Sequence, residues 1–192
     1  MDIKKNLTIV IITLFIWGNA LASGKVPESI TVTLNDLGAG KFKRVKWGDL
    51  EILVVRRSAS QLKNLDSEVS QLADPISEER IPLESIICKE CVSKESFVRT
   101  NHRSINPEFF AAINMGPYSG CHIIPFLKEG EHYWSNGNKV GLGNRWKGGF
   151  YDSCRNLKYD LSGRIYKNEK SQENLFIPAY QVNQENELVL GK

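Results

Sequence analysis

Four cysteines, at positions 88, 91, 121 and 154, are the residues whose type and spacing most readily support chemistry. Cys88 and Cys91 form a C-x-x-C motif, the spacing at which thiol oxidoreductases hold a reactive thiolate beside the cysteine that resolves its mixed disulfide. Those enzymes carry the motif in a βαβ unit, which this sequence does not predict. We therefore favour a structural disulfide between Cys88 and Cys91, and keep a redox pair as the alternative.

The three histidines do not form a second candidate site. His102, His122 and His132 stand far apart, without partners at metal-ligand spacing, so each is expected to be structural or solvated. A metal site made by His122 and Asp152 has no positive support in the sequence. No catalytic residue and no metal ligand is predicted.

Composition bounds the class of protein. The chain has 192 residues, of which 41% are hydrophobic and 24% charged, as expected for one folded domain. The formal charge is only +3, without a concentrated basic patch, so nucleic-acid binding is not expected.

The first 22 residues have the pattern of a signal peptide. Lys4 and Lys5 precede an apolar run over 7–17, and Ala20-Leu21-Ala22 supplies small residues at a cleavage site. That run is much shorter than the roughly 20 residues of a spanning helix. We expect Sec-type export to the periplasm, with no stable membrane span after cleavage. The alternative is an uncleaved signal that anchors the chain in the inner membrane.

The remainder predicts a mainly β fold with one short helix and no parallel sheet. The helix should begin after Ser58 as N-cap, carry Leu62, Leu65, Val69 and Leu72 at helical spacing, and end before Pro75. Gly48-Asp49 marks a hairpin turn, and 134–149 is expected to be mostly loop. The predicted strands are 29–34, 41–47, 50–55, 109–113, 122–127, 175–177 and 188–190.

Two cysteine neighbourhoods carry a resemblance. They read G-P-Y-S-G-C at 116–121 and Y-D-S-C-R at 151–155, followed by Y-D at 159–160 and G-R-I at 163–165. With V-V-R-R at 54–57, this series resembles the Rieske iron–sulfur protein of quinol–cytochrome c reductase complexes, whose two boxes are C-T-H-L-G-C and C-P-C-H-G-S. The resemblance extends over 29–190. It implies an antiparallel β-sandwich or barrel over 23–192, after a signal peptide at 1–22, with a cluster-binding-type subdomain at about 115–160.

The ligand positions of that family are altered here. Its [2Fe–2S] cluster is held by one cysteine and one histidine from each box. Aligned on the boxes, those four positions fall on Gly116, Tyr118, Asp152 and Arg155. Glycine has no donor atom and arginine brings a fixed positive charge, so no cofactor is expected. A [2Fe–2S] cluster is expected only if this interpretation of the ligand positions is wrong.

The two remaining box cysteines are Cys121 and Cys154. The resemblance implies that they form the disulfide that joins the two loops in the family. By the chain-entropy estimate, such a cross-link stabilises a fold by roughly 3–4 kcal/mol.

The function expected from these observations is that of an exported, cluster-free Rieske-like protein, a structural or protein-interaction module of the periplasm. Its partner would be a protein, belonging to an envelope or respiratory complex. One alternative is an iron–sulfur electron-transfer subunit of a quinol–cytochrome c reductase. The other is a periplasmic thiol–disulfide redox protein that uses Cys88 and Cys91.

Overall fold

The computed structural model of the chain describes residues 25–78, 88–131, 133–135, 138–140, 146–167 and 169–192. The signal peptide predicted for 1–22 lies outside these residues. Within the described ranges, no helix combines the length and the apolar character of a membrane span.

The described residues form three antiparallel sheets of three strands each and one two-stranded hairpin. Sheet one orders β1 (Ile30–Val32), β11 (Leu188–Leu190) and β10 (Tyr180–Val182). Sheet two orders β2 (Lys41–Trp47), β3 (Leu50–Arg56) and β4 (Phe109–Ile113). Sheet three orders β5 (Ile124–Phe126), β8 (Gly149–Asp152) and β9 (Leu157–Tyr159), and the hairpin joins β6 (Tyr133–Ser135) to β7 (Asn138–Val140). The predicted mainly β fold, without parallel pairing, is confirmed.

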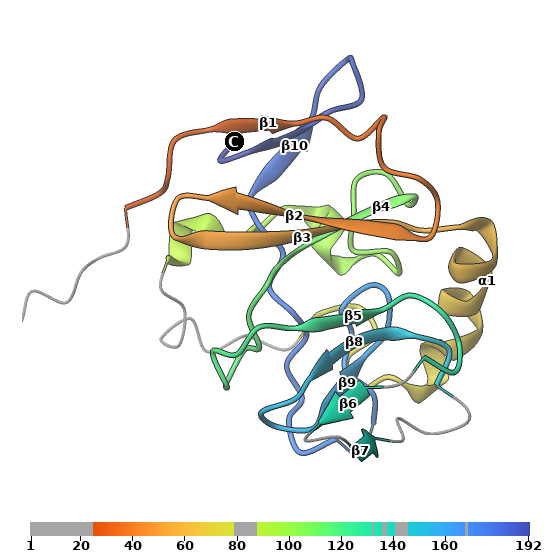
Figure 1. Ribbon diagram of the computed structural model, residues 1–192. Helices are drawn as coiled ribbons and strands as arrows, with labels where there is room; N and C mark the ends of the chain where they lie inside the picture. Colours follow the sequence, from red (N-terminus) through yellow and green to blue (C-terminus); the bar gives the residue numbers. More distant parts are fainter. Residues whose placement is uncertain (1–24, 79–87, 132, 136–137, 141–145, 168) are drawn as a thin grey trace, which may run out of the picture.

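Sheet two lies between the other two sheets, with sheet three below it in Figure 1. Its central strand, β3, is an apolar run whose residues 52–55 are fully buried, as expected for a strand covered on both faces. Phe110 of β4 packs on Phe150 of β8 with ring centroids 5.5 Å apart. This contact fixes sheet three, which carries the candidate site, to the core.

The β2–β3 hairpin is the one that the sequence predicts. Trp47 pairs with Leu50 across the turn, and Gly48 adopts φ +58°. A side chain at Gly48 would also come within 2.6 Å of Pro27. Glycine is therefore required both by the backbone conformation and by the close approach of the N-terminal segment.

The single α-helix among the described residues, α1 (Ala59–Glu68), has the predicted start. Ser58 accepts a hydrogen bond from the Gln61 backbone amide, and the Gln61 side chain accepts one from the Ser58 amide, which is a capping box. Leu65 is 1% exposed and faces the core. The α-helix ends at Glu68, earlier than predicted, because the chain tightens into a 3₁₀ turn over Val69–Gln71.

Three strand predictions are corrected. The buried segment 175–177 is not a strand, because its backbone groups bond to three separate segments, at Gly163, Ile113 and Ser93, in place of one ladder. The strands predicted at 29–34 and 122–127 shrink to β1 and β5. The expected loop over 134–149 contains most of the β6–β7 hairpin and the start of β8.

Candidate functional site

Two loops next to sheet three bring the predicted ligand positions together. The first loop links β4 to β5, and the second links β8 to β9. A disulfide joins them through Cys121 and Cys154, with an S–S distance of 1.99 Å and a Cα–Cα distance of 6.4 Å. We call residues 116–122 and 152–156 the tip. The pairing is the one that the family resemblance implies.

Asp152 ties the two loops from inside the tip. Asp152 is fully buried. Its Oδ2 accepts a 2.7 Å hydrogen bond from the Ser119 hydroxyl of the first loop. Its Oδ1 accepts bonds of 2.9 Å and 3.2 Å from the backbone amides of Cys154 and Arg155. Both carboxylate oxygens are thus satisfied by protein donors, which is what burial of a carboxylate demands.

Gly116 stands directly against this arrangement. A Cβ atom added to Gly116 would lie 2.3 Å from Asp152 Oδ2 and 2.4 Å from Ser119 Oγ. The hydrogen-bonded carboxylate and hydroxyl therefore occupy the space that a cysteine side chain would need. Glycine at this position is explained by close approach, since its backbone does not require a left-handed conformation.

Tyr118 and Arg155 face outward. Tyr118 is 39% exposed, and the Arg155 guanidinium carbon lies 5.8 Å from the centroid of its ring. This distance is within the range of a cation–π contact. The two positions at which the family has histidines thus form a side-chain pair on the surface of the tip.

These four positions do not fit a [2Fe–2S] cluster. The cluster needs two thiolates and two imidazoles, whereas the positions supply no donor at Gly116, a saturated carboxylate at Asp152, and a phenol stacked against a guanidinium. Within the part of the chain that the structure describes, no three His, Cys, Asp or Glu side chains gather at metal-binding distance. The disulfide and the Asp152 hydrogen bonds link the two loops.

Tyr159 ends β9 and belongs to the Y-D pair that follows the second cysteine loop. Here the residue is fully buried, and its hydroxyl has no hydrogen-bond partner among the described residues. Burial raises the pKa of Tyr159, and the nearby negative charges of Asp152 and Glu169 raise it further. The ring of Tyr159 packs in the hydrophobic core.

A pocket of about 470 Å³ opens beside the tip, lined by Tyr118, Arg155 and residues 169–173. Burial raises the pKa of Glu169, an effect that the positive charge of Lys158 opposes. The Glu173 carboxylate is hydrogen-bonded within its own segment, because it accepts a hydrogen bond from the Ser171 hydroxyl at 2.5 Å.

The second cysteine pair lies far from water. Cys88 and Cys91 form a disulfide with a Cα–Cα distance of 5.3 Å, and the two residues are 4% and 0% exposed. The Cys91 carbonyl accepts a 2.7 Å hydrogen bond from the Ala179 amide. The C-x-x-C motif is thus built into the core, without the accessible sulfur that exchange requires.

The histidines are dispersed, as the sequence indicates. His122 is exposed and follows Cys121, whereas His102 is half-buried and its Nδ1 has no partner among the described residues. Burial lowers the pKa of His102, and the positive charge of Arg57 adds to the effect. His132 lies outside the described residues.

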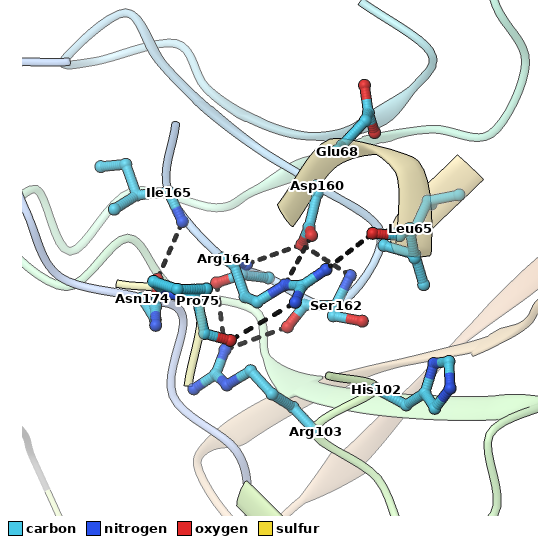
Figure 2. Close-up of polar contacts among 12 residues, drawn as sticks. Leu65, Glu68, Pro75, His102, Arg103, Asp160, Ser162, Arg164, Ile165 and Asn174 are labelled. Carbon is cyan, nitrogen blue, oxygen red and sulfur yellow. Dashed lines mark hydrogen bonds and ion pairs between the residues drawn. The ribbon is translucent and has the colours of Figure 1, made fainter. Parts of the chain in front are cut away.

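A buried arginine network holds the segment that follows β9 in the chain (Figure 2). Arg164 donates through Nε to Asp160 Oδ2 at 2.7 Å, and both side chains are fully buried. Arg103 donates to the carbonyls of Ser162 and Gly163, each at 3.0 Å. The segment after β9 is thereby held in one conformation.

Sequence reasoning missed two features of this site. One is the Ser119 hydroxyl, whose signal was a hydroxyl directly after the altered ligand position Tyr118. The other is the buried network, whose arginines were visible only as parts of the V-V-R-R and G-R-I motifs. Charge in a sequence is normally interpreted as exposed, so neither signal predicts burial.

Comparison with known proteins identifies similar chains. The sequence is 30% identical over 163 residues to the ubiquinol-cytochrome c reductase iron-sulfur subunit of Allochromatium vinosum, covering 85% of this chain and 69% of that protein. It is 27% identical over 164 residues to the cytochrome b-c1 complex subunit Rieske-1, mitochondrial, of Arabidopsis thaliana, covering 46% of that protein. The mouse subunit Rieske is 26% identical over 165 residues, again with 46% covered. No protein-family model matches the chain.

Proposed function

The chain belongs to the Rieske iron–sulfur protein family, and from this premise we propose that it is a cluster-free member, a structural or protein-interaction module of the periplasm. The observation that carries the proposal is the Asp152 carboxylate. It accepts three hydrogen bonds from the two tip loops and fills the space in front of Gly116. Protein contacts thus take over the role of holding the loops together.

Selective change at the tip supports this function. The disulfide, the sheets and the arginine network all serve the fold, and they are retained. The residues that would hold and tune a cluster are replaced, and the Tyr159 hydroxyl is left without an acceptor among the described residues. Because the fold alone does not determine function, we look for the function of this chain in the surface of the tip.

The surface offered to a partner is the outer face of the tip. Tyrosine and arginine are enriched at the energetic centres of protein interfaces, and Tyr118 and Arg155 form a pair there. Similar proteins carry names that place them in the cytochrome b-c1 complex or in ubiquinol–cytochrome c reductase. We propose a protein partner in an envelope or respiratory complex, contacted by this face.

The proposal includes export. Residues 1–22 would be removed as a Sec signal, leaving one Rieske-like domain over 23–192 in the periplasm. Without cleavage, the same segment would anchor the domain in the inner membrane.

Iron–sulfur electron transfer is the second candidate, because the relative from Allochromatium is named as an iron–sulfur subunit. It requires a cluster held by side chains other than the four aligned positions. The third candidate, redox work by Cys88 and Cys91, is disfavoured by the burial of both residues.

Metal analysis of the purified protein distinguishes the first two candidates. We expect neither iron nor acid-labile sulfide in stoichiometric amounts, and no visible absorbance band from a cluster. Two irons and two sulfides per chain would establish the electron-transfer candidate and overturn the cluster-free one.

The proposed protein contact is tested by cross-linking this protein to its neighbours in the periplasm and identifying the captured protein by mass spectrometry. The double variant Tyr118→Ala/Arg155→Ala should lose the captured partner. Ile105→Ala serves as the matched control, because Ile105 is 45% exposed and lies outside the tip. Equal capture by both variants would contradict a contact through the tip.

A further inference from the structure

The two disulfides of this protein differ in their access to solvent. Cys88 and Cys91 are 4% and 0% exposed. At the tip, Cys154 is exposed and Cys121 is half-buried. The C-x-x-C spacing directs attention to the first pair, but only the second pair includes an exposed residue.

We propose that the Cys121–Cys154 disulfide is a thiol–disulfide exchange site, reduced by a dithiol, whereas Cys88–Cys91 is a permanent structural cross-link. The inference concerns the same tip as the proposed function and rests on it. In a cluster-free tip, opening the disulfide releases no metal, and the loops keep other contacts.

The positive charge next to the exposed residue Cys154 favours attack by an anion. Arg155 follows Cys154 directly and is also exposed, and it lines the adjacent pocket together with Lys170. The negative charge of Asp152 is buried and receives three hydrogen bonds. An approaching thiolate therefore meets the exposed guanidinium of Arg155 beside Cys154, whereas the adjacent pocket carries Glu169 and Glu173 as well as Lys170.

The exchange proceeds in two balanced steps. A thiolate of the dithiol attacks Cys154 Sγ, the bond between Cys154 and Cys121 breaks, and Cys121 leaves as a thiolate that takes up a proton. The second thiol of the reductant then attacks the mixed disulfide and releases Cys154 as a thiol. Two electrons and two protons pass to the protein, and the reductant becomes a disulfide.

After reduction, the two loops of the tip would be less constrained but would stay in contact. The Ser119–Asp152 hydrogen bond and the Tyr118–Arg155 contact still link the loops. Both contacts are weaker constraints than a covalent cross-link, so the pocket beside the tip gains freedom. Oxidation state would thereby set the shape of the surface that the partner binds.

The test uses the unmodified protein. It is incubated with dithiothreitol at graded ratios of reduced to oxidised reagent, quenched in acid and alkylated, and the labelled cysteines are located by peptide mass spectrometry. We expect Cys121 and Cys154 to be labelled at least about tenfold faster than Cys88 and Cys91, which can react only from an opened state. Equal rates, or no labelling of either pair without denaturant, would overturn the proposal.

A variant tests the electrostatic part. Arg155→Ala should slow reduction of the tip disulfide several-fold at low ionic strength, whereas Arg99→Ala, an exposed arginine outside the tip, should not. An unchanged rate in Arg155→Ala would contradict the role of that charge. Iron and sulfide analysis of the same sample separates a failure of this inference from a failure of the cluster-free proposal.

Discussion

At the scale of single residues, Asp152 explains more of the tip than any other side chain. A carboxylate at a position where the family has a cysteine looks like a lost ligand in the sequence. In the fold it is a fully buried acceptor for donors from both loops. Gly116 and Ser119 are its counterparts, because the first makes room for it and the second binds it. Asp152, Gly116 and Ser119 therefore depend on one another and form one structural unit.

Removal of the Asp152 carboxylate should destabilise the fold. Asp152→Ala leaves two amides and a hydroxyl without their acceptor, so we expect a loss of about 2–3 kcal/mol in the free energy of unfolding, measured in urea. Ser153→Ala, at the exposed neighbouring residue, should cost less than about 0.5 kcal/mol. Equal stability of the two variants would show that the carboxylate does not hold the loops.

Glu68 gives a prediction about pH. Burial raises the pKa of Glu68, although its hydrogen bond from the Tyr166 hydroxyl opposes the shift. The folded protein therefore holds this proton more tightly than the unfolded chain, and stability falls as the pH rises above the ordinary value of about 4.3. Glu68→Gln removes the ionisation but keeps an acceptor for Tyr166.

We expect Glu68→Gln to melt at a higher temperature than the wild type at pH 7, with the difference vanishing near pH 4. Thermal unfolding at several pH values measures it. Glu90→Gln, at an exposed position, is the control and should follow the wild type throughout. A Glu68→Gln variant that is less stable than the wild type at pH 7 would contradict a raised pKa of Glu68 in the folded protein.

At the scale of elements, loops form the tip, and buried charges hold the segment that follows β9. Asp160 follows β9 directly and accepts hydrogen bonds from the amides of Ser162 and Arg164, both at 2.8 Å. Arg164 reaches from there to the carbonyls of Leu65 and Pro75, each at 3.3 Å (Figure 2). The segment between β9 and residue 165 is thus fastened to the end of α1.

Breaking the Asp160–Arg164 pair should therefore be costly. Arg164→Met leaves Asp160 as a buried carboxylate without its partner, for which we expect a loss of about 3–5 kcal/mol in urea unfolding. Lys43→Ala breaks the solvent-exposed pair with Asp36 and should cost less than about 1 kcal/mol. A cost for Arg164→Met as small as that of Lys43→Ala would mean that the network does not stabilise the segment that follows β9.

The elements also show what local sequence can predict. The β2–β3 hairpin and the start of α1 follow from Gly48 and from the Ser58–Gln61 capping box, because both are local signals. The segment 175–177 was wrongly predicted as a strand, since apolar residues there signal burial and not ladder formation. Its hydrogen bonds go to three distant segments, which no local pattern specifies.

At the scale of the whole molecule, a mainly β fold that fits the family carries the tip at one of its sheets. Sheet two holds the other two sheets on opposite sides (Figure 1). The sequence predicted this class of fold, and the resemblance implied which four positions would meet at the tip. It did not predict that Asp152 turns inward while Arg155 and Tyr118 face solvent, because those orientations depend on packing between loops distant in the chain.

Export makes a prediction for the whole chain. If residues 1–22 are a cleaved Sec signal, the protein recovered from the periplasm should begin at Ser23, as measured by mass spectrometry of its N-terminal peptide. Ala22→Leu, which removes a small residue from the predicted cleavage site, should leave the chain longer and in the membrane fraction. Recovery of an intact N-terminus from wild-type cells would support the anchored alternative.

A tip that is closed by protein contacts should not accept a cluster, even when iron and sulfide are supplied. Anaerobic reconstitution of the reduced protein with ferrous iron and sulfide, followed by desalting and measurement of bound iron and acid-labile sulfide, tests this directly. We expect iron and sulfide well below one per chain after desalting, at the level of a protein without iron sites. Two irons and two sulfides bound per chain would contradict the cluster-free function.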